Sequence, residues 1–342
     1  MIDMQKSYGG PMNLNRYEIF LKVAEVGNIT KAAEVLHYTQ AGISHAVAAL
    51  EKETGVSLFL RSASGVTLTE NGTYLFPYIQ QLVNDQRGLA QAIYEVNHVV
   101  AGTLRLGTFA SVSAQWVPQI IRGFQKKYPQ VEFELIEGDY DDVAERIKVG
   151  KIDCGFLSAP VEEKLQFTSL YQDPLMVVLP PHHRLAEKEK LTLEDIQKEP
   201  FIFPIKGSDN DILAVLKDYL KKIHIRYTLE SDSSIMSMVE NGFGITIMTD
   251  LVLRNFNFHL AIRPLYPMKY RTLGIAALPE DRQTILTKTF IRYLNDGDWE
   301  LGIRKYDSIC RGTSVLSHSS GENQRGGCSS CILRFEHITR AR

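Results

Sequence analysis

Apolar side chains near the start of the chain recur with the spacing of short helices. One face of residues 14–26 carries Leu14, Tyr17, Phe20, Leu21 and Ala24. A glycine and an asparagine follow this segment, and Thr30 is placed to cap a second helix over residues 31–38. The small residues Ala32 and Ala33 would let that helix pack closely. The pattern predicts two short helices joined by a tight turn.

A third helix is predicted over residues 40–54, with Thr39 at the N-cap position and Gly55 at the end. One side of this helix repeats aliphatic residues at helical spacing and is expected to face a core, through Ile43, Val47 and Leu50. The opposite side of its first turns remains available for contacts, through Gln40, Ala41, Ser44 and His45.

Two short β-prone runs, SLFLR and VTLT, follow the third helix and predict a hairpin. Thr69 can then cap a long helix from Glu70 to about Val96. Its apolar seam alternates spacings of four and three, with one polar member, through Leu75, Ile79, Leu82, Gln86, Leu89, Ile93 and Val96. This spacing is typical of a coiled coil and favours dimerisation, although a helix packed on its own domain would show the same seam.

From residue 101 the pattern changes to strands that alternate with helices, and it continues to about Asn295. Such alternation predicts largely parallel sheet covered by helices on both faces. The alternation occurs twice, with DILAVLKDYLKKI as a helix of the second half, so two similar α/β lobes are expected. Beyond residue 295 no periodicity is sustained, and residues 296–342 are expected to be a disordered tail.

Length and composition fit a folded protein with more than one core. A chain of 342 residues exceeds a single typical core, and 44% of its residues are hydrophobic. The sequence shows neither an apolar stretch that could span a membrane nor a signal peptide, so we expect a cytoplasmic protein without membrane contact. Residues 13–71 contain five lysines and arginines against six acids, so bulk charge does not indicate a nucleic-acid partner for this region.

The sequence offers little support for catalysis or for a bound metal. Cys154 stands alone in the body of the chain, and the remaining cysteines, Cys310, Cys328 and Cys331, lie in the tail. A single Cys-x-x-Cys pair in glycine- and serine-rich sequence is weak evidence for a metal site. No arrangement of nucleophile, base and acid is recognisable. We therefore expect a protein that is not an enzyme and needs no metal or cofactor.

The free end of the third helix has the chemistry for reading DNA. Gln40 can bond adenine with two hydrogen bonds, Ser44 can bond bases or phosphate, and Ala41 can touch a thymine methyl group. His45 can donate to guanine or phosphate. Further phosphate contacts are expected near the helix N-termini, from Thr30, Lys31 and Thr39. Arg61, next to the hairpin, is expected to contact either the DNA backbone or the minor groove.

The stretch from LNRYEIFLKVAEV through TQAGIS and LEKETGVSLFLR to VTLTENG resembles the N-terminal domain of LysR-type transcriptional regulators. The resemblance extends more loosely to about residue 295. It implies an α/β protein with a helical N-terminal domain: a winged helix-turn-helix, a linker helix, and a periplasmic-binding-protein-like (type 2) effector domain. The expected parts are an extension (1–13), the winged domain (14–69), the linker helix (70–100), the effector domain (101–295) and the tail (296–342).

The resemblance also assigns the DNA-contact residues. Gln40, Ala41, Ser44 and His45 inherit base contacts, and Arg61 inherits a backbone contact. The family usually has proline at the position of Ala41 and arginine at the position of His45, so a permanent charge is missing from the reading surface. Protonation of His45 would restore part of that charge.

Within the effector domain, one lobe is expected to comprise residues 101–173 with 274–295 and the other residues 174–273. Ligands of open α/β sheets bind beyond the carboxyl ends of the strands. This rule and the family pattern point to a cleft lined by Ser111, Ser113, Tyr140, Phe203, Ile205 and Ile245. Each of these residues could instead serve a turn or the packing of a core.

The function expected from this resemblance is DNA binding biased by a small molecule. A homodimer or homotetramer joined through the linker helices would hold several winged domains on promoter DNA and would act with RNA polymerase. An effector between the lobes would change the spacing of those domains. The alternative is a solute-binding protein that uses only the two lobes, but such a protein would not need the first hundred residues.

Overall fold

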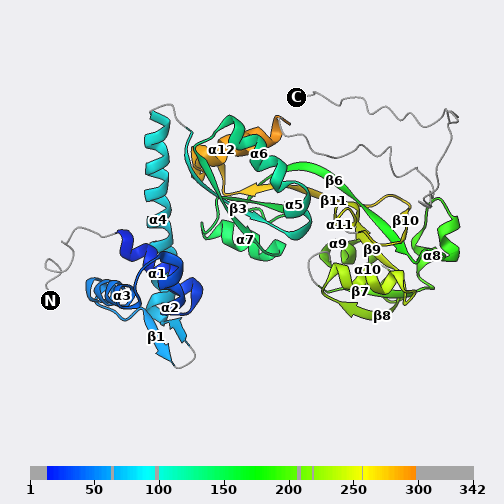
Figure 1. Ribbon diagram of the computed structural model, residues 1–342, viewed down its shortest axis with the longest axis horizontal. Coiled ribbons are helices and arrows are strands. Elements are labelled where there is room, and N and C mark those ends of the chain that lie inside the picture. The colour runs from blue at the N-terminus through cyan, green and yellow to red at the C-terminus, as the bar shows by residue number, and fades with distance from the viewer. Residues whose placement is uncertain are drawn as a thin grey trace, which may run out of the picture. The chain divides into compact units, whose positions relative to one another are not determined.

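The structure is a computed structural model that describes residues 14–62, 65–96, 100–205, 209–217, 219–255 and 257–297 (Figure 1). The predictions for the extension (1–13), for nearly all of the tail (298–342) and for its three cysteines lie outside these residues. In the described part, no helix combines the length and apolar character that a membrane span requires.

The N-terminal domain contains three helices and a hairpin, which are α1 (Leu14–Val26), α2 (Ile29–Leu36), α3 (Gln40–Thr54), β1 (Phe59–Ser62) and β2 (Gly65–Leu68). The strands pair antiparallel, which confirms the predicted hairpin. Side chains from α1, α2 and α3 close over a shared core that includes Phe20, Val23, Ala32, Ile43 and Leu50. The predicted bounds of α1 and α3 are confirmed, and so is the buried side of α3. The predicted face of α1 is only partly right, because its buried residues are Tyr17, Ile19, Phe20 and Val23.

The second helix begins earlier than expected. Asn28, and not Thr30, caps it: the Asn28 side chain accepts a hydrogen bond from Lys31 N at 3.0 Å. Thr30 is an exposed residue in the first turn. Asparagine and threonine are both good N-caps, and Gly27, with φ of 65°, turns the chain so that Asn28 reaches the position first.

The long helix α4 (Glu70–Val96) begins as predicted, with Thr69 Oγ1 accepting a hydrogen bond from Gly72 N at 2.9 Å. Its predicted seam divides into two parts. Ile79 is buried in the core of the winged domain and Leu82 packs against that core, whereas Leu89 and Val96 are exposed. The first half of α4 therefore packs on its own domain, which was the alternative left open by the sequence, and the second half presents apolar side chains on its surface.

The first lobe is a sheet with helices on both faces. Its strands are ordered β4 (Val131–Glu137), β3 (Gly102–Thr108), β5 (Cys154–Ser158), β11 (Tyr270–Ala277) and β6 (Gln166–Leu179). Strands β3, β4 and β5 are parallel, and β11 runs antiparallel to β5 and β6. One face packs on α6 (Val117–Lys127) and α12 (Ile285–Asn295), and the other packs on α7 (Tyr140–Lys148).

The second lobe is built on the continuation of β6, which pairs with β9 (Thr246–Thr249) and β10 (Ala261–Pro264). A parallel pair, β7 (Pro200–Pro204) and β8 (His224–Leu229), joins it through a bridge between Phe201 and Ile245. The helices and the 3-10 turn of this region are η1 (Arg184–Glu187), α8 (Leu193–Ile196), α9 (Asp209–Leu216), α10 (Asp232–Glu240) and α11 (Asp250–Leu253). A second 3-10 turn, η2 (Glu280–Arg282), joins β11 to α12 in the first lobe. The helix predicted over DILAVLKDYLKKI is wrong in length, because α9 ends at Leu216.

Two strands connect the lobes. Strand β6 belongs to both sheets, and the start of β11 pairs with β6 where it leaves the first lobe (Figure 1). At this crossing Arg271 of β11 stands opposite Asp173 of β6. The polar residues of the predicted cleft lie around that point.

Candidate nucleic-acid interface and interlobe site

The N-terminal end of α3 is held in place by its cap and its buried side. Thr39 Oγ1 accepts a hydrogen bond from Gly42 N at 3.0 Å, which satisfies a backbone donor of the first turn. Ile43 and Val47 are fully buried beneath the helix. The predicted contact residues lie on the other side, where Gln40, Ala41 and His45 are exposed and Ser44 is half-buried. The helix can therefore offer amide, hydroxyl and imidazole groups to a duplex without uncovering its core.

The residues predicted to bind phosphate are also accessible. Thr39, Thr30 and Lys31 are exposed at the starts of α3 and α2, and Arg61 is exposed on β1 opposite Val66. The cap uses Thr39 Oγ1 as an acceptor, so its hydroxyl hydrogen is still able to donate to a phosphate oxygen.

The acidic residues of this domain are largely engaged within it. Glu53 accepts hydrogen bonds from Arg16 at 3.3 Å and Tyr17 Oη at 3.1 Å, and burial together with this carboxylate raises the pKa of Tyr17. Glu51 Oε1 accepts from the backbone of Leu58 and Phe59. These carboxylates brace the fold and leave the α3 N-terminus without an acidic neighbour in its own first turn.

The basic residues divide in a complementary way. Arg16 and Lys22 form ion pairs with Glu53 and Glu25. Among the described residues, Lys31, Lys52 and Arg61 have no ion-pair partner. Lys31 and Arg61 lie at predicted phosphate positions, so their charge is available to a polyanion, whereas Lys52 lies in the last turn of α3, away from that surface. The nearly balanced charge of the domain thus conceals an uneven distribution, which the sequence count could not reveal.

Between the lobes, the predicted serines lie on α5 (Ala110–Gln115). Ser111 is buried, and its Oγ accepts a hydrogen bond from Arg271 Nη2 at 3.1 Å. Ser113 Oγ lies 3.1 Å from Thr108 Oγ1. The loop after β3 therefore directs one hydroxyl at the strand crossing and uses the other within its own turn.

Tyr140 is the first residue of α7 and lies at the same point. Its hydroxyl accepts a hydrogen bond from Arg271 Nη1 at 2.8 Å and donates to Asp211 Oδ2 at 3.0 Å. Burial raises the pKa of Tyr140, against the opposing effect of Arg271, so the group remains a neutral donor.

The three predicted cleft residues of the second lobe lie elsewhere. Phe203 and Ile245 are buried in the apolar core of that lobe, so packing accounts for both. Ile205 is exposed just after β7. The strand that carries Phe203 was correctly identified, but β7 is buried on both sides, so Phe203 packs in the core.

Four polar residues of the site were missed by the sequence prediction: Ser158, Asp173, Asp211 and Arg271. Arg271 and Asp173 form a buried ion pair, with Arg271 Nη2 2.7 Å from Asp173 Oδ2. Asp211 accepts a hydrogen bond from Ser158 Oγ at 2.9 Å. A usable indication was present in the sequence, because Arg271 and Asp173 are charged residues beside apolar strand segments, where burial requires a partner.

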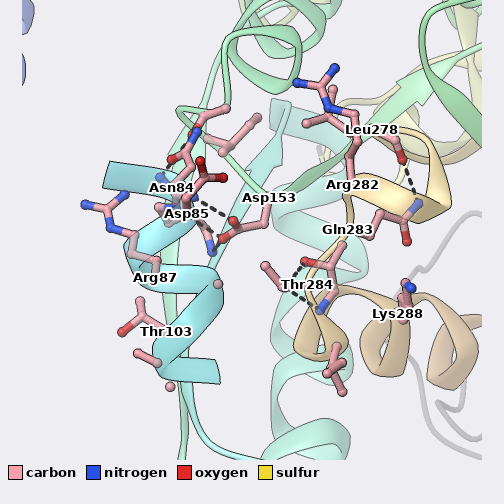
Figure 2. A pocket seen from close by; sticks show the side chains of 18 of the residues that line it. Asn84, Asp85, Arg87, Thr103, Asp153, Leu278, Arg282, Gln283, Thr284 and Lys288 are labelled. Atoms are coloured by element: carbon pink, nitrogen blue, oxygen red, sulfur yellow. Dashed lines mark hydrogen bonds and ion pairs between the residues drawn. The ribbon is translucent and has the colours of Figure 1, made fainter. Parts of the chain in front are cut away.

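A cavity of about 730 Å³ lies apart from this site, between α4 and the first lobe (Figure 2). Four basic side chains line it together with four acidic ones: Arg87, Arg105, Arg282, Lys288, Asp85, Glu134, Asp153 and Asp281. Arg105 is already engaged, since Nη2 and Nε bond Asp153 at 2.6 and 3.1 Å. None of the predicted effector residues lines this cavity, and its balanced lining favours no ligand charge.

Comparisons with known proteins agree over both parts of the chain. Residues 14–73 match the profile of the bacterial regulatory helix-turn-helix proteins of the lysR family, and residues 97–298 match the LysR substrate binding domain. The HTH-type transcriptional regulator YvbU of Bacillus subtilis, which is uncharacterised, is 30% identical over 283 residues, covering 82% of this chain and 97% of YvbU. AlsR of the same species is 27% identical over 290 residues, covering 83% and 96%.

Solved structures show the same fold. A full-length OxyR variant from Pseudomonas aeruginosa superposes with a TM-score of 0.67 at 21% identity, covering 86% of this chain and 97% of that one. Full-length CbnR, solved in complex with its target DNA, gives a TM-score of 0.59 at 19% identity, covering 83% and 99%.

Proposed function

Because the chain belongs to the LysR family of bacterial helix-turn-helix regulatory proteins, we infer that it is a transcriptional regulator with a DNA-binding domain and an effector-binding domain. The helix-turn-helix match favours this function over a solute-binding protein built from the lobes alone. Its relatives are named as regulators of transcription and not as enzymes. A regulator that binds the chromosome works in the bacterial cytoplasm.

For the DNA contacts, we propose that the N-terminal end of α3 enters the major groove. Gln40, Ala41, Ser44 and His45 would contact base edges, while phosphates would be bound by Thr30, Lys31, Thr39 and Arg61. The observation that carries this proposal is the exposed polar end of α3 above a fully buried aliphatic side.

A mobility-shift assay with DNA from upstream of the chain's own coding sequence tests this assignment. Gln40→Ala and Ser44→Ala should each weaken the specific shift by about 5- to 150-fold, because a good base contact contributes about 1–3 kcal/mol of discrimination. Lys52→Ala, at the far end of α3, is the matched control and should bind the fragment normally. Normal binding by both Gln40→Ala and Ser44→Ala would contradict the contact assignment.

A variant of Arg61 distinguishes general DNA affinity from base recognition in the same assay. Arg61→Ala should weaken binding to specific and mixed-sequence DNA by similar factors and lower the slope of log affinity against log salt by about one. A loss confined to the specific fragment would instead make Arg61 a base-reading residue.

We further propose that the effector binds between the lobes, at the group of polar side chains around Arg271. The proposal is supported by the hydrogen bonds that join this group: Ser111 and Tyr140, predicted from the sequence, bond Arg271, and the group also contains Ser158, Asp173 and Asp211. A ligand that favours one arrangement of the lobes would shift the equilibrium of a dimer or tetramer on DNA. The exposed half of α4 would form the contact between copies, and the bound regulator would act with RNA polymerase at the promoter.

A further inference from the structure

The carboxylate of Asp211 extends from the second lobe into the first. Asp211 lies on α9, yet its side chain is 8% exposed and contacts three residues of the first lobe. Oδ1 accepts from Ser158 Oγ at 2.9 Å, and Oδ2 accepts from Tyr140 Oη at 3.0 Å. Arg271 Nη1 lies 3.5 Å from the same Oδ2. Hydrogen bonds from the ends of three separate elements thus converge on one carboxylate.

This set of donors recognises a carboxylate whatever molecule carries it. Two hydroxyl donors and a guanidinium edge suit the two oxygens of a planar anion. The rest of the guanidinium is already engaged, because Nε and Nη2 bond Asp173 and Nη2 also donates to Ser111. Nη1 is therefore the nitrogen of Arg271 that contacts Asp211.

The charges at this point do not permit a second anion beside Asp211. The positive charge of Arg271 is matched by Asp173, so Asp211 already adds a net negative charge. Asp232, on α10 of the second lobe, also senses the charge of Arg271, and burial raises its pKa. A further carboxylate would be repelled by these groups, and it would find the donors Ser158 and Tyr140 occupied unless it displaced Asp211.

We propose that Asp211 is an intramolecular ligand of the effector site and that the effector is a small carboxylate that displaces it. This inference rests on the proposed binding of an effector between the lobes. Without effector, the tethered carboxylate joins the second lobe to Ser158, Tyr140 and Arg271. When a free carboxylate takes these donors, α9 loses its bonds to the first lobe, and the balance between lobe arrangements changes.

Removal of the tethered carboxylate provides the test. Asp211→Ala leaves the three donors in place with space for one acetate, so thermal unfolding of the full chain is measured in sodium acetate. Sodium chloride at equal ionic strength and neutral acetamide serve as controls. The variant should unfold at a lower temperature than the wild type, and acetate should raise its Tm at a concentration about tenfold lower than any effect on the wild type.

Two further variants show whether acetate occupies this site. Asp232→Ala removes the other carboxylate that senses Arg271 and should respond to acetate only as the wild type does. Tyr140→Phe combined with Asp211→Ala removes one donor and should reduce the acetate response. Should Asp211→Ala fail to fold, Asp211→Asn keeps the shape, gives up the charge and should also acquire an acetate response.

The outcomes separate this inference from the proposed function. Equal acetate responses of wild type and both Asp211 variants, or an equal effect of acetamide, would overturn the role of Asp211. Mobility shifts are measured on the same proteins: retained DNA binding with no acetate response overturns this inference alone. Absence of any DNA binding by the wild type would overturn the proposed function.

Discussion

Arg271 and Asp173 stand opposite each other in the two strands that connect the lobes, and their side chains are 2% and 0% exposed. Arg271 Nε and Nη2 lie 2.8 and 2.7 Å from Asp173 Oδ2. Asp173 Oδ1 also accepts from Leu251 N, at 3.1 Å, which ties the start of α11 to the same point. A buried charge pair thus lies where the two sheets meet and orients the guanidinium toward the site.

Replacement of Asp173 should leave Arg271 buried without its main counter-charge. We expect Asp173→Asn to lower the free energy of unfolding by about 3–5 kcal/mol, as measured by urea denaturation. Lys22→Ala breaks the more exposed pair with Glu25 and serves as the comparison, with an expected change below about 1 kcal/mol. If Asp173→Asn changed the free energy of unfolding by no more than Lys22→Ala does, the buried pair would contribute nothing measurable to stability.

Two glycines of α4 should respond in opposite directions to alanine. A Cβ at Gly72 would lie 2.2 Å from Leu58 O, a backbone atom, whereas a Cβ at Gly88 meets nothing within 4 Å. Gly88→Ala should raise stability by about 0.8–1 kcal/mol through helix propensity. Gly72→Ala should lower the Tm, because α4 must move away from the backbone of Leu58, the residue before β1. A stabilisation by Gly72→Ala equal to that by Gly88→Ala would contradict the close approach of α4 to the Leu58 backbone.

Substitutions in the two halves of α4 should have different effects, one on stability and the other on oligomerisation. Ile79 is 6% exposed in the core of the winged domain, and Ile79→Ala should cost about 2–5 kcal/mol in urea unfolding. Leu89 is 64% exposed, and Leu89→Asp should lower the oligomeric state seen by light scattering without loss of helical circular dichroism. If Leu89→Asp left the oligomeric state unchanged, the contact between copies would not involve this half of α4.

Asp232 gives a prediction for the pH dependence of stability. Burial raises its pKa above the ordinary 3.8, so the folded state disfavours the charged carboxylate. The wild type therefore loses stability as the pH rises through the window that begins near 3.8. Asp232→Asn cannot ionise and should have the higher Tm at neutral pH, with the difference vanishing below that window. A constant difference across the pH range would contradict this cause.

Sequence patterns predicted an element reliably where residues close to it in the sequence determine its structure. The caps at Thr39 and Thr69 follow from short side chains that reach backbone donors three residues away. The start of α2 was less well determined, because Asn28 and Thr30 are both competent caps. The seam of α4 showed that one face is apolar, but its spacing does not specify whether the winged domain or another chain covers it.

The sequence by itself determined the winged helix-turn-helix, the long helix, the two α/β lobes and the exposed end of α3, because spacing and turn residues encode local structure. Only the tertiary structure decided how the interlobe site is assembled. Arg271 meets Asp173, Ser111 and Tyr140 from 98, 160 and 131 residues away. A charged side chain is buried only where a partner neutralises it. Because the partners here are remote in the sequence, local spacing could not identify them.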